Sequence, residues 1–181
     1  MNITVYCASA PGDLPIWNTA ANDLGGWIAR NGHQLVYGGA DVGLMGTLAD
    51  AVLAGNGIVH GVVPRFLCDR EIAHHGLTEL EIVETMSQRK ERMIELGDVF
   101  IALPGGPGTL EEISEIFSLI KLKRPPGICV LYDIGGFYAP LVELLDSMQA
   151  HGFLLPHDRA RIHRVQGTAQ LSTLLENGMG T

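Results

Sequence analysis

Residues 99–112, with the sequence VFIALPGGPGTLEE, form the most informative segment of this chain. The first five of them are all apolar and end at Pro104, which is typical of a parallel β-strand buried on both faces. Beyond the glycines, apolar residues recur at helical spacing from Leu110 to Ile120, so an amphipathic helix is predicted. A buried strand that leads through a glycine-rich turn into a helix is a building unit of α/β proteins.

The turn at 104–109 has the features of an anion-binding site. Glycines let backbone N–H groups approach a ligand closely, and the N-terminus of a helix carries roughly half a positive charge. The turn therefore predicts a phosphate site. A purely structural role is also open, because Thr109 and Glu112 have the spacing of a helix capping box. The chain has neither the Gly-Lys-Ser/Thr ending of a triphosphate-binding loop nor an intact G-x-G-x-x-G motif.

Strand and helix patterns alternate along the rest of the chain. Strands are expected at 3–7, 34–37, 58–63, 80–84, 99–103 and 127–132. Helices are expected at about 14–30, capped by Asp13, and at 44–54, 87–96, 110–120, 136–150 and 168–175. Residues 65–80 are expected to form a mobile loop and residues 151–164 a polar connection. This alternation predicts one domain over residues 1–181, with a parallel sheet that helices cover on both faces.

Three turns of this sheet are expected at its ligand-binding edge. Ligands of such sheets bind beyond the carboxyl ends of the strands. The turn at 104–109, a second glycine-rich segment at 38–46 and the turn that holds Ser9 each follow an expected strand. They are therefore predicted to lie near one another.

The helix expected at 87–96 carries a second chemical signal. Arg89, Met93 and Leu96 fall on one face, so Arg89 shares the packed face with apolar residues. A basic side chain in that position needs an anionic partner, because its desolvation is unfavourable. An arginine that extends to the surface, or that pairs with a structural carboxylate, fits the pattern as well. Together with the glycine-rich turn, Arg89 favours a polar pocket for an anionic ligand.

Composition limits the classes of function. The formal net charge of −8 opposes binding to a nucleic-acid polymer, which needs a basic surface, but allows a small phosphorylated ligand. The three cysteines are widely spaced and suggest neither a zinc site nor a disulfide framework. His74 and His75 have no third ligand nearby in the sequence, so no metal is expected. With no signal peptide and no long apolar span, a cytoplasmic location is expected.

These segments together resemble the LONELY GUY family. The resemblance rests on P-G-G-x-G-T-x-x-E at 104–112 and M-x-x-R-K at 86–90, and it extends to 38–46, Pro64 and 70–72. Members of this family are cytokinin riboside 5′-monophosphate phosphoribohydrolases, often labelled possible lysine decarboxylases. The resemblance implies a Rossmann-like, doubly wound sheet. It also implies a homodimer or larger homo-oligomer, and an activity that requires no metal and no organic cofactor.

The implied reaction is hydrolysis of the N-glycosidic bond of adenine-type nucleoside 5′-monophosphates to free base and ribose 5-phosphate. Arg89 and Glu112 match the catalytic pair of the family. Glu112 would stabilise the oxocarbenium-like state, and Arg89 would offset the charge of the departing base. The positions that match substrate-binding residues, together with three from the neighbouring turns, are Glu71, Lys90, Gly105, Gly106, Pro107, Gly108, Thr109, Leu110 and Glu111, with Ser9, Gly43 and Met45.

Alternative functions also follow from the sequence. One is a nucleosidase that acts on plain purine or pyrimidine 5′-monophosphates. Another is a non-catalytic carrier of a nucleotide or cofactor, although a pure binder has no need of the Glu112 carboxylate near the ribose. Pyridoxal-dependent lysine decarboxylation is not favoured, because the lysines at 90, 121 and 123 lie in no recognisable cofactor context.

Overall fold

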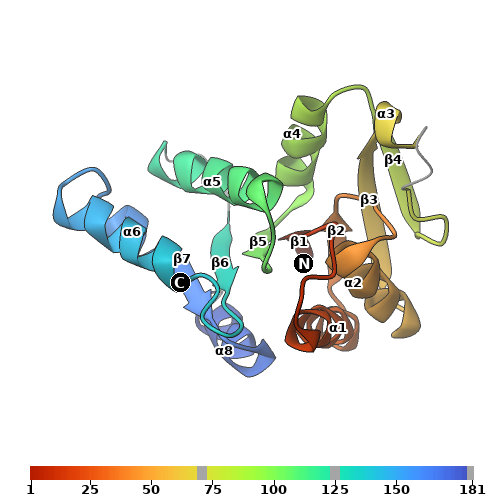
Figure 1. Ribbon diagram of the computed structural model, residues 1–181, viewed down its shortest axis with the longest axis horizontal. Helices are drawn as coiled ribbons and strands as arrows, with labels where there is room; N and C mark the ends of the chain where they lie inside the picture. Colours follow the sequence, from red (N-terminus) through yellow and green to blue (C-terminus); the bar gives the residue numbers. More distant parts are fainter. Residues whose placement is uncertain (69–72, 123–126, 179–181) are drawn as a thin grey trace.

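The computed structural model describes residues 1–68, 73–122 and 127–178 (Figure 1). Strands and helices alternate along most of this part of the chain. In chain order the elements are β1 (Asn2–Tyr6), α1 (Pro15–Arg30), β2 (Gln34–Tyr37), α2 (Gly43–Ala54), β3 (Ile58–Pro64), α3 (Arg65–Cys68), β4 (Glu79–Val83), α4 (Met86–Leu96), β5 (Val99–Ala102), α5 (Pro107–Lys121), β6 (Ile128–Tyr132), α6 (Ala139–Ala150), α7 (Pro156–Arg159), β7 (Ile162–Val165) and α8 (Thr168–Gly178).

The described strands form one seven-stranded sheet in the order β4-β3-β2-β1-β5-β6-β7, and every neighbouring pair is parallel. The chain builds outward from β1 to β4, then returns to place β5 on the other side of β1 and continues to β7. The prediction of a Rossmann-like, doubly wound sheet is therefore confirmed. The strand order reverses between β1 and β5, and a crevice at such a reversal is the usual ligand site of these folds.

Helices cover both faces of the sheet. In Figure 1, α1, α2 and α8 lie below the sheet, and α4 and α5 lie above it. One apolar core joins α1, α2 and α8 to strand residues such as Ile3 and Val5, and a second joins α4, α5 and α6 to residues such as Tyr6 and Phe100. Successive strand residues alternate between the two cores because their side chains point to opposite faces.

Two segments differ from the expectation of irregular structure. The connection predicted at 151–164 contains α7 and begins β7, and the stretch from residue 65 begins with the four-residue α3. β7 lies at the edge of the sheet and pairs only with β6 among the described strands. Ile162 and Val165 are buried, whereas the two residues between them are not, so this short strand lacks the continuous apolar run of a central strand.

Helix starts also differ in detail. The prediction that Asp13 caps α1 is wrong: the N-cap is Leu14, and Asp13 instead accepts a hydrogen bond from the Trp17 indole N–H at 3.2 Å. α6 begins at Ala139, three residues later than expected. α4 has an unforeseen capping box, in which the hydroxyl of Thr85 accepts from the N–H of Gln88.

Candidate active site

A cleft of about 400 Å³ opens at the carboxyl edge of the sheet, where the strand order reverses between β1 and β5. Its volume is in the range of small-molecule sites. The turn after β1, the segment after β2, the start of α4 and the start of α5 all contribute to its walls. The lining residues are Cys7, Ala8, Ser9, Ala10, Gly38, Ala40, Met45, Leu67, Met86, Arg89, Gly106, Pro107, Gly108, Thr109, Glu111 and Glu112.

The N-terminus of α5 forms one wall of the cleft. Gly106 is the N-cap and Pro107 is the first helical residue, so the N–H groups without a partner inside the helix are those of Gly106, Gly108 and Thr109. A Cβ added at Gly106 or Gly108 would meet nothing within 4 Å, so the space beside both residues is open. The capping-box interpretation of Thr109 and Glu112 is wrong, because α5 has no side-chain cap and starts earlier.

Arg89 and Glu112 form a buried ion pair that also lines the cleft. Arg89 Nη1 donates to Glu112 Oε1 at 3.0 Å, and the two residues are only 8% and 7% exposed. Arg89 Nε also donates to the carbonyl oxygen of Val62 at 3.2 Å, which fixes the plane of the guanidinium. The helical spacing correctly placed Arg89 on the packed face of α4, beside the buried Met93.

Gly38 creates the room for this pair. A Cβ at Gly38 would overlap Arg89 Nη2 and come close to the methyl group of Met45. Gly38 belongs to the glycine-rich segment 38–46, but it is not among the residues predicted for the site. The signal that points to it is a glycine directly after a buried strand, a position where backbone often approaches a functional group closely.

Burial and neighbouring charges set the protonation of the site. Burial raises the pKa of the Glu112 carboxyl, and the Arg89 guanidinium opposes that rise. Burial also raises the pKa of Tyr6 well above its ordinary value, and the Glu112 charge adds to the effect. The pKa of the Cys7 thiol is raised by burial too, so this lining residue is protonated at neutral pH and is a poor nucleophile.

Lys90 contacts the site through two carboxylates of α5. Its ammonium group pairs with Glu111 and, at 3.0 Å, with Glu115, and hydrogen bonds to both raise its pKa. Glu111 lines the cleft, whereas Lys90 and Leu110 are not among the described residues that do so. Lys90 therefore balances the charges of Glu111 and Glu115 on α5. Leu110 is half exposed.

The other predicted residues divide into three groups. Ser9 and Met45 line the cleft, and the N–H of Met45 donates to the Ala8 carbonyl oxygen at 3.3 Å. Gly43 is not among the described residues that line the cleft, but it packs against one that does. It has a φ of 59°, and a Cβ there would overlap the backbone of Ser9. Glu71 lies outside the described residues.

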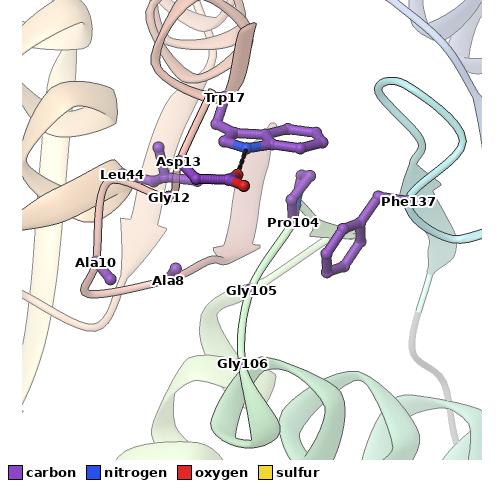
Figure 2. Close-up of a pocket in the computed structure, with 10 residues that line it drawn as sticks. All are labelled: Ala8, Ala10, Gly12, Asp13, Trp17, Leu44, Pro104, Gly105, Gly106 and Phe137. Atoms are coloured by element: carbon purple, nitrogen blue, oxygen red, sulfur yellow. Dashed lines mark hydrogen bonds between the residues drawn. The ribbon is translucent and has the colours of Figure 1, made fainter. Parts of the chain in front are cut away.

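A smaller apolar hollow of about 250 Å³ lies on the other side of the glycine turn (Figure 2). Its lining includes the large side chains of Trp17, Leu44, Pro104 and Phe137, and also Gly105. It shares Ala8, Ala10 and Gly106 with the larger cleft. The aromatic side chains of this hollow were not predicted, since they come from α1 and from the loop before α6.

Among the described residues, no three His, Cys, Asp or Glu side chains gather in an arrangement that could hold a metal ion. His74 pairs instead with Asp50, at 3.1 Å. In the same part of the chain, no helix has the length and apolar character needed to cross a membrane.

The fold and the cleft define a Rossmann-like α/β protein with a buried Arg–Glu pair beside an open helix N-terminus at the strand-order reversal. Residues 45–175 match the family described as "Possible lysine decarboxylase", and the chain belongs to this family. The resemblance to LONELY GUY proteins is thereby confirmed, because curated relatives with that activity in their names align with most of the chain.

Three of these relatives illustrate the similarity. The cytokinin riboside 5′-monophosphate phosphoribohydrolase of Rhodococcoides fascians is 46% identical over 162 residues, which is 89% of this chain and 82% of the relative. LOG of Oryza sativa subsp. japonica is 38% identical, covering 96% of this chain and 72% of the relative. LOG7 of Arabidopsis thaliana is also 38% identical, covering 96% of this chain and 80% of the relative.

Solved structures with the same fold include molybdenum cofactor proteins. The carrier protein of Chlamydomonas reinhardtii superposes with a TM-score of 0.73 at 20% identity, covering 99% of this chain and 98% of that one. The molybdenum cofactor binding protein of Rippkaea orientalis gives a TM-score of 0.68 at 19% identity, covering 97% of this chain and 94% of that one. At these identities the similarity concerns the fold alone.

Proposed function

We propose that this protein hydrolyses the N-glycosidic bond of adenine-type (cytokinin) nucleoside 5′-monophosphates, releasing the free base and ribose 5-phosphate. The observation that carries the proposal is the buried contact between Arg89 and Glu112 in a cleft that also contains the N-terminus of α5. The names of relatives up to 46% identical support the same activity.

The N-terminus of α5 is the proposed phosphate site. The N–H groups of Gly106, Gly108 and Thr109 are available there, and the helix adds partial positive charge. Pro107 has no N–H, but it favours the backbone conformation with which a helix begins. This local positive region would hold a dianionic phosphate despite the overall charge of −8.

Glu112 and Arg89 are the proposed catalytic residues. Cleavage of the bond between C1′ and the base nitrogen develops positive charge on the ribose, which the Glu112 carboxylate would stabilise. The same carboxylate would orient a water molecule, whose oxygen bonds to C1′ as the bond to the base breaks. Glu112 would accept the proton that this water loses, and the base nitrogen gains a proton as it leaves, so that the net reaction adds OH to C1′ and H to the base. The departing base gains electron density, and the Arg89 guanidinium would offset it. Each effect is worth about 10²-fold or more in rate.

Lysine decarboxylation receives no support from the described lysines. Such chemistry needs a desolvated lysine amine able to form a Schiff base. Lys90 is held as a cation by Glu111 and Glu115, and the ammonium group of Lys121 donates to the Phe153 carbonyl oxygen at 3.3 Å. Lys123 lies outside the described residues.

We further propose that the protein works as a homodimer or larger homo-oligomer in the cytoplasm. Apolar side chains are exposed on α6 and in the segment after it, among them Leu144, Met148 and Phe153, of which Phe153 is 74% exposed. A second copy of the chain is the proposed partner. Light scattering should then give a mass of at least twice 19.5 kDa, and a monomer mass would contradict the proposal.

Free-base release tests the function directly. AMP and isopentenyladenosine 5′-monophosphate are each assayed beside the corresponding nucleoside, with Glu112→Gln as the inactive control. Release from the monophosphates alone is the expected result, and the ratio between them distinguishes cytokinin activation from general nucleotide hydrolysis. Tight nucleotide binding without base release from any substrate would overturn the proposal in favour of a carrier.

A further inference from the structure

The loop between β6 and α6 touches the glycine turn from within the protein. The hydroxyl of Tyr138, at the end of this loop, donates to the carbonyl oxygen of Leu103 at 2.7 Å, and both residues are buried. Leu103 directly precedes the turn at 104–106. Its own N–H donates to the carbonyl oxygen of Tyr6 at 2.9 Å, which extends the pairing between β1 and β5. Leu103 is thus held on both sides of its backbone.

Tyr138 is itself held by a buried carboxylate. Asp133 is fully buried, and its Oδ1 accepts from the N–H of Tyr138 at 2.6 Å. Its Oδ2 accepts from Arg164 Nε, also at 2.6 Å, and its N–H donates to the Val165 carbonyl oxygen at 2.7 Å. A buried carboxylate is tolerated only where its oxygens are paired and hydrogen-bonded, as they are here. Asp133 therefore fastens the loop to β7.

The neighbouring Phe137 packs on the outer side of the same turn. Its ring makes edge contacts with Trp17, at 5.9 Å between centroids, and with Tyr138, at 5.0 Å. Figure 2 shows Phe137 beside Pro104, across the apolar hollow from Ala8. The loop thus contacts the turn with two adjacent aromatic residues, of which only Tyr138 is hydrogen-bonded to it among the described contacts.

This contact matters because the turn has little intrinsic rigidity. Proline fixes φ at Pro104, but it has no N–H with which to hold the turn, and the following Gly105 and Gly106 have wide conformational freedom. On the far side, the N–H of Leu110 donates to the Gly106 carbonyl oxygen, which begins the hydrogen bonding of α5. Burial raises the pKa of Tyr138, so its hydroxyl keeps the proton that it donates.

We propose that Tyr138 is a positioning residue: through the carbonyl of Leu103 it orients the turn at 104–106 so that the N-terminus of α5 can bind the phosphate of the substrate. The inference rests on the proposed function for the identity of the ligand. The effect is expected on phosphate binding first, because Leu103 directly precedes the turn that leads to the N-terminus of α5, whereas Glu112 follows one helical turn later and Arg89 lies on α4.

The substitution Tyr138→Phe removes the hydroxyl and keeps the ring that packs in the core. Calorimetry is used to titrate ribose 5-phosphate and free adenine into the wild-type protein and the variant. Loss of one hydrogen bond is expected to weaken ribose 5-phosphate binding roughly fivefold, with adenine binding unchanged. In the hydrolysis assay, KM for the monophosphate should rise by a similar factor while kcat stays within about twofold.

Tyr132→Phe is the matched control. Tyr132 ends β6 and is also buried, but it packs in the other core, with α1 and α8. This variant should bind ribose 5-phosphate like the wild type. Amide exchange at Gly105 and Gly106, followed by NMR, should be faster in Tyr138→Phe than in either wild type or control.

Two results would overturn the proposal. One is unchanged ribose 5-phosphate binding in Tyr138→Phe. The other is an equal loss of adenine and ribose 5-phosphate binding, which indicates a general loosening of the fold. Because binding is measured without turnover, this comparison remains valid even if the base-release assay disproves hydrolysis, and the two failures are distinguishable.

Discussion

Arg89 Nη1 donates a hydrogen bond to Glu112 Oε1 at 3.0 Å, which joins two residues 23 positions apart in a buried contact between α4 and α5. Neither charge could be buried at this depth without the other, because removing one partner leaves an uncompensated buried ion. The carboxylate nevertheless faces the cleft, where it can act on a ligand. This pair is therefore the natural place to begin testing the proposed chemistry.

Glu112→Gln should abolish hydrolysis while keeping nucleotide binding. The amide oxygen can still accept from Arg89, but the neutral side chain cannot stabilise positive charge on the ribose. We expect a loss of about 100-fold or more in kcat, measured by base release, with the affinity for AMP within a few-fold of wild type by calorimetry. Normal turnover by this variant would remove Glu112 from the mechanism.

The pH dependence of kcat should reflect the environment of Glu112. Burial raises the pKa of its carboxyl above the ordinary value of 4.5, so the active carboxylate is lost, and the rate falls, as the pH drops through this raised pKa. Arg89 opposes the rise. In Arg89→Met, the pH at which the remaining kcat falls on acidification should therefore be higher than in the wild type. In Arg89→Lys, which keeps a positive charge, this pH should stay nearly unchanged. An unchanged pH in Arg89→Met would contradict this assignment.

Gly38→Ala should disturb the pair without unfolding the protein. The added Cβ overlaps the end of the flexible Arg89 side chain, which can move away and lose its contact with Glu112. We expect base release to fall about 100-fold, an effect comparable to losing a positioned charge. Gly26→Ala is the control, because a Cβ at Gly26 approaches the end of Arg30 on α1, far from the cleft. Equal activity in the two variants would argue against a catalytic role for Arg89.

Gly108→Ala should separate stability from ligand binding. Gly108 lies in the first turn of α5 and has open space beside it, so alanine fits and should stabilise the helix by about 0.5–1 kcal/mol. The same methyl group would occupy the proposed phosphate site. We expect Tm to rise slightly while ribose 5-phosphate binding weakens at least tenfold. Gly167→Ala, which also meets no atom within 4 Å, should leave binding unchanged.

If Gly108→Ala bound ribose 5-phosphate as tightly as wild type, the phosphate would have to lie elsewhere in the cleft. Thermal denaturation and calorimetry on the same sample decide between these outcomes. A general loss of folded protein would lower both Tm and binding. A rise in Tm together with weaker ribose 5-phosphate binding therefore cannot result from such a loss.

Local patterns in the sequence were sufficient for most of the sheet. The segments at 3–6 and 99–102 became adjacent central strands, since a strand buried on both faces is largely apolar. The buried hydroxyl of Thr4 is the polar exception, and it donates a hydrogen bond to the carbonyl oxygen of Met93 at 3.0 Å. The short edge strand β7 was missed because it is buried at only two of its four residues. The prediction that Asp13 caps α1 was wrong because the N-cap is Leu14, and the Asp13 carboxylate accepts a hydrogen bond from the indole N–H of Trp17, four residues away.

Glu112 shows where local spacing is insufficient. The spacing of Glu112 from Thr109 suits a capping box. The spacing of Glu112 from Arg89 along the chain gives no indication that the two side chains are in contact. In the folded protein, α5 begins before Thr109, so Thr109 is not the N-cap, and the Glu112 carboxylate pairs with the buried Arg89 guanidinium instead.

The order of apolar runs, glycine turns and helical periods along this chain specifies a parallel α/β sheet and a glycine-rich turn at the start of a helix, because each of these depends on neighbours within a few residues. The pairing of Arg89 with Glu112, the space that Gly38 leaves for it and the bond from Tyr138 to Leu103 depend on tertiary structure. They join side chains from different crossovers, and only the strand order brings those crossovers together at one edge of the sheet.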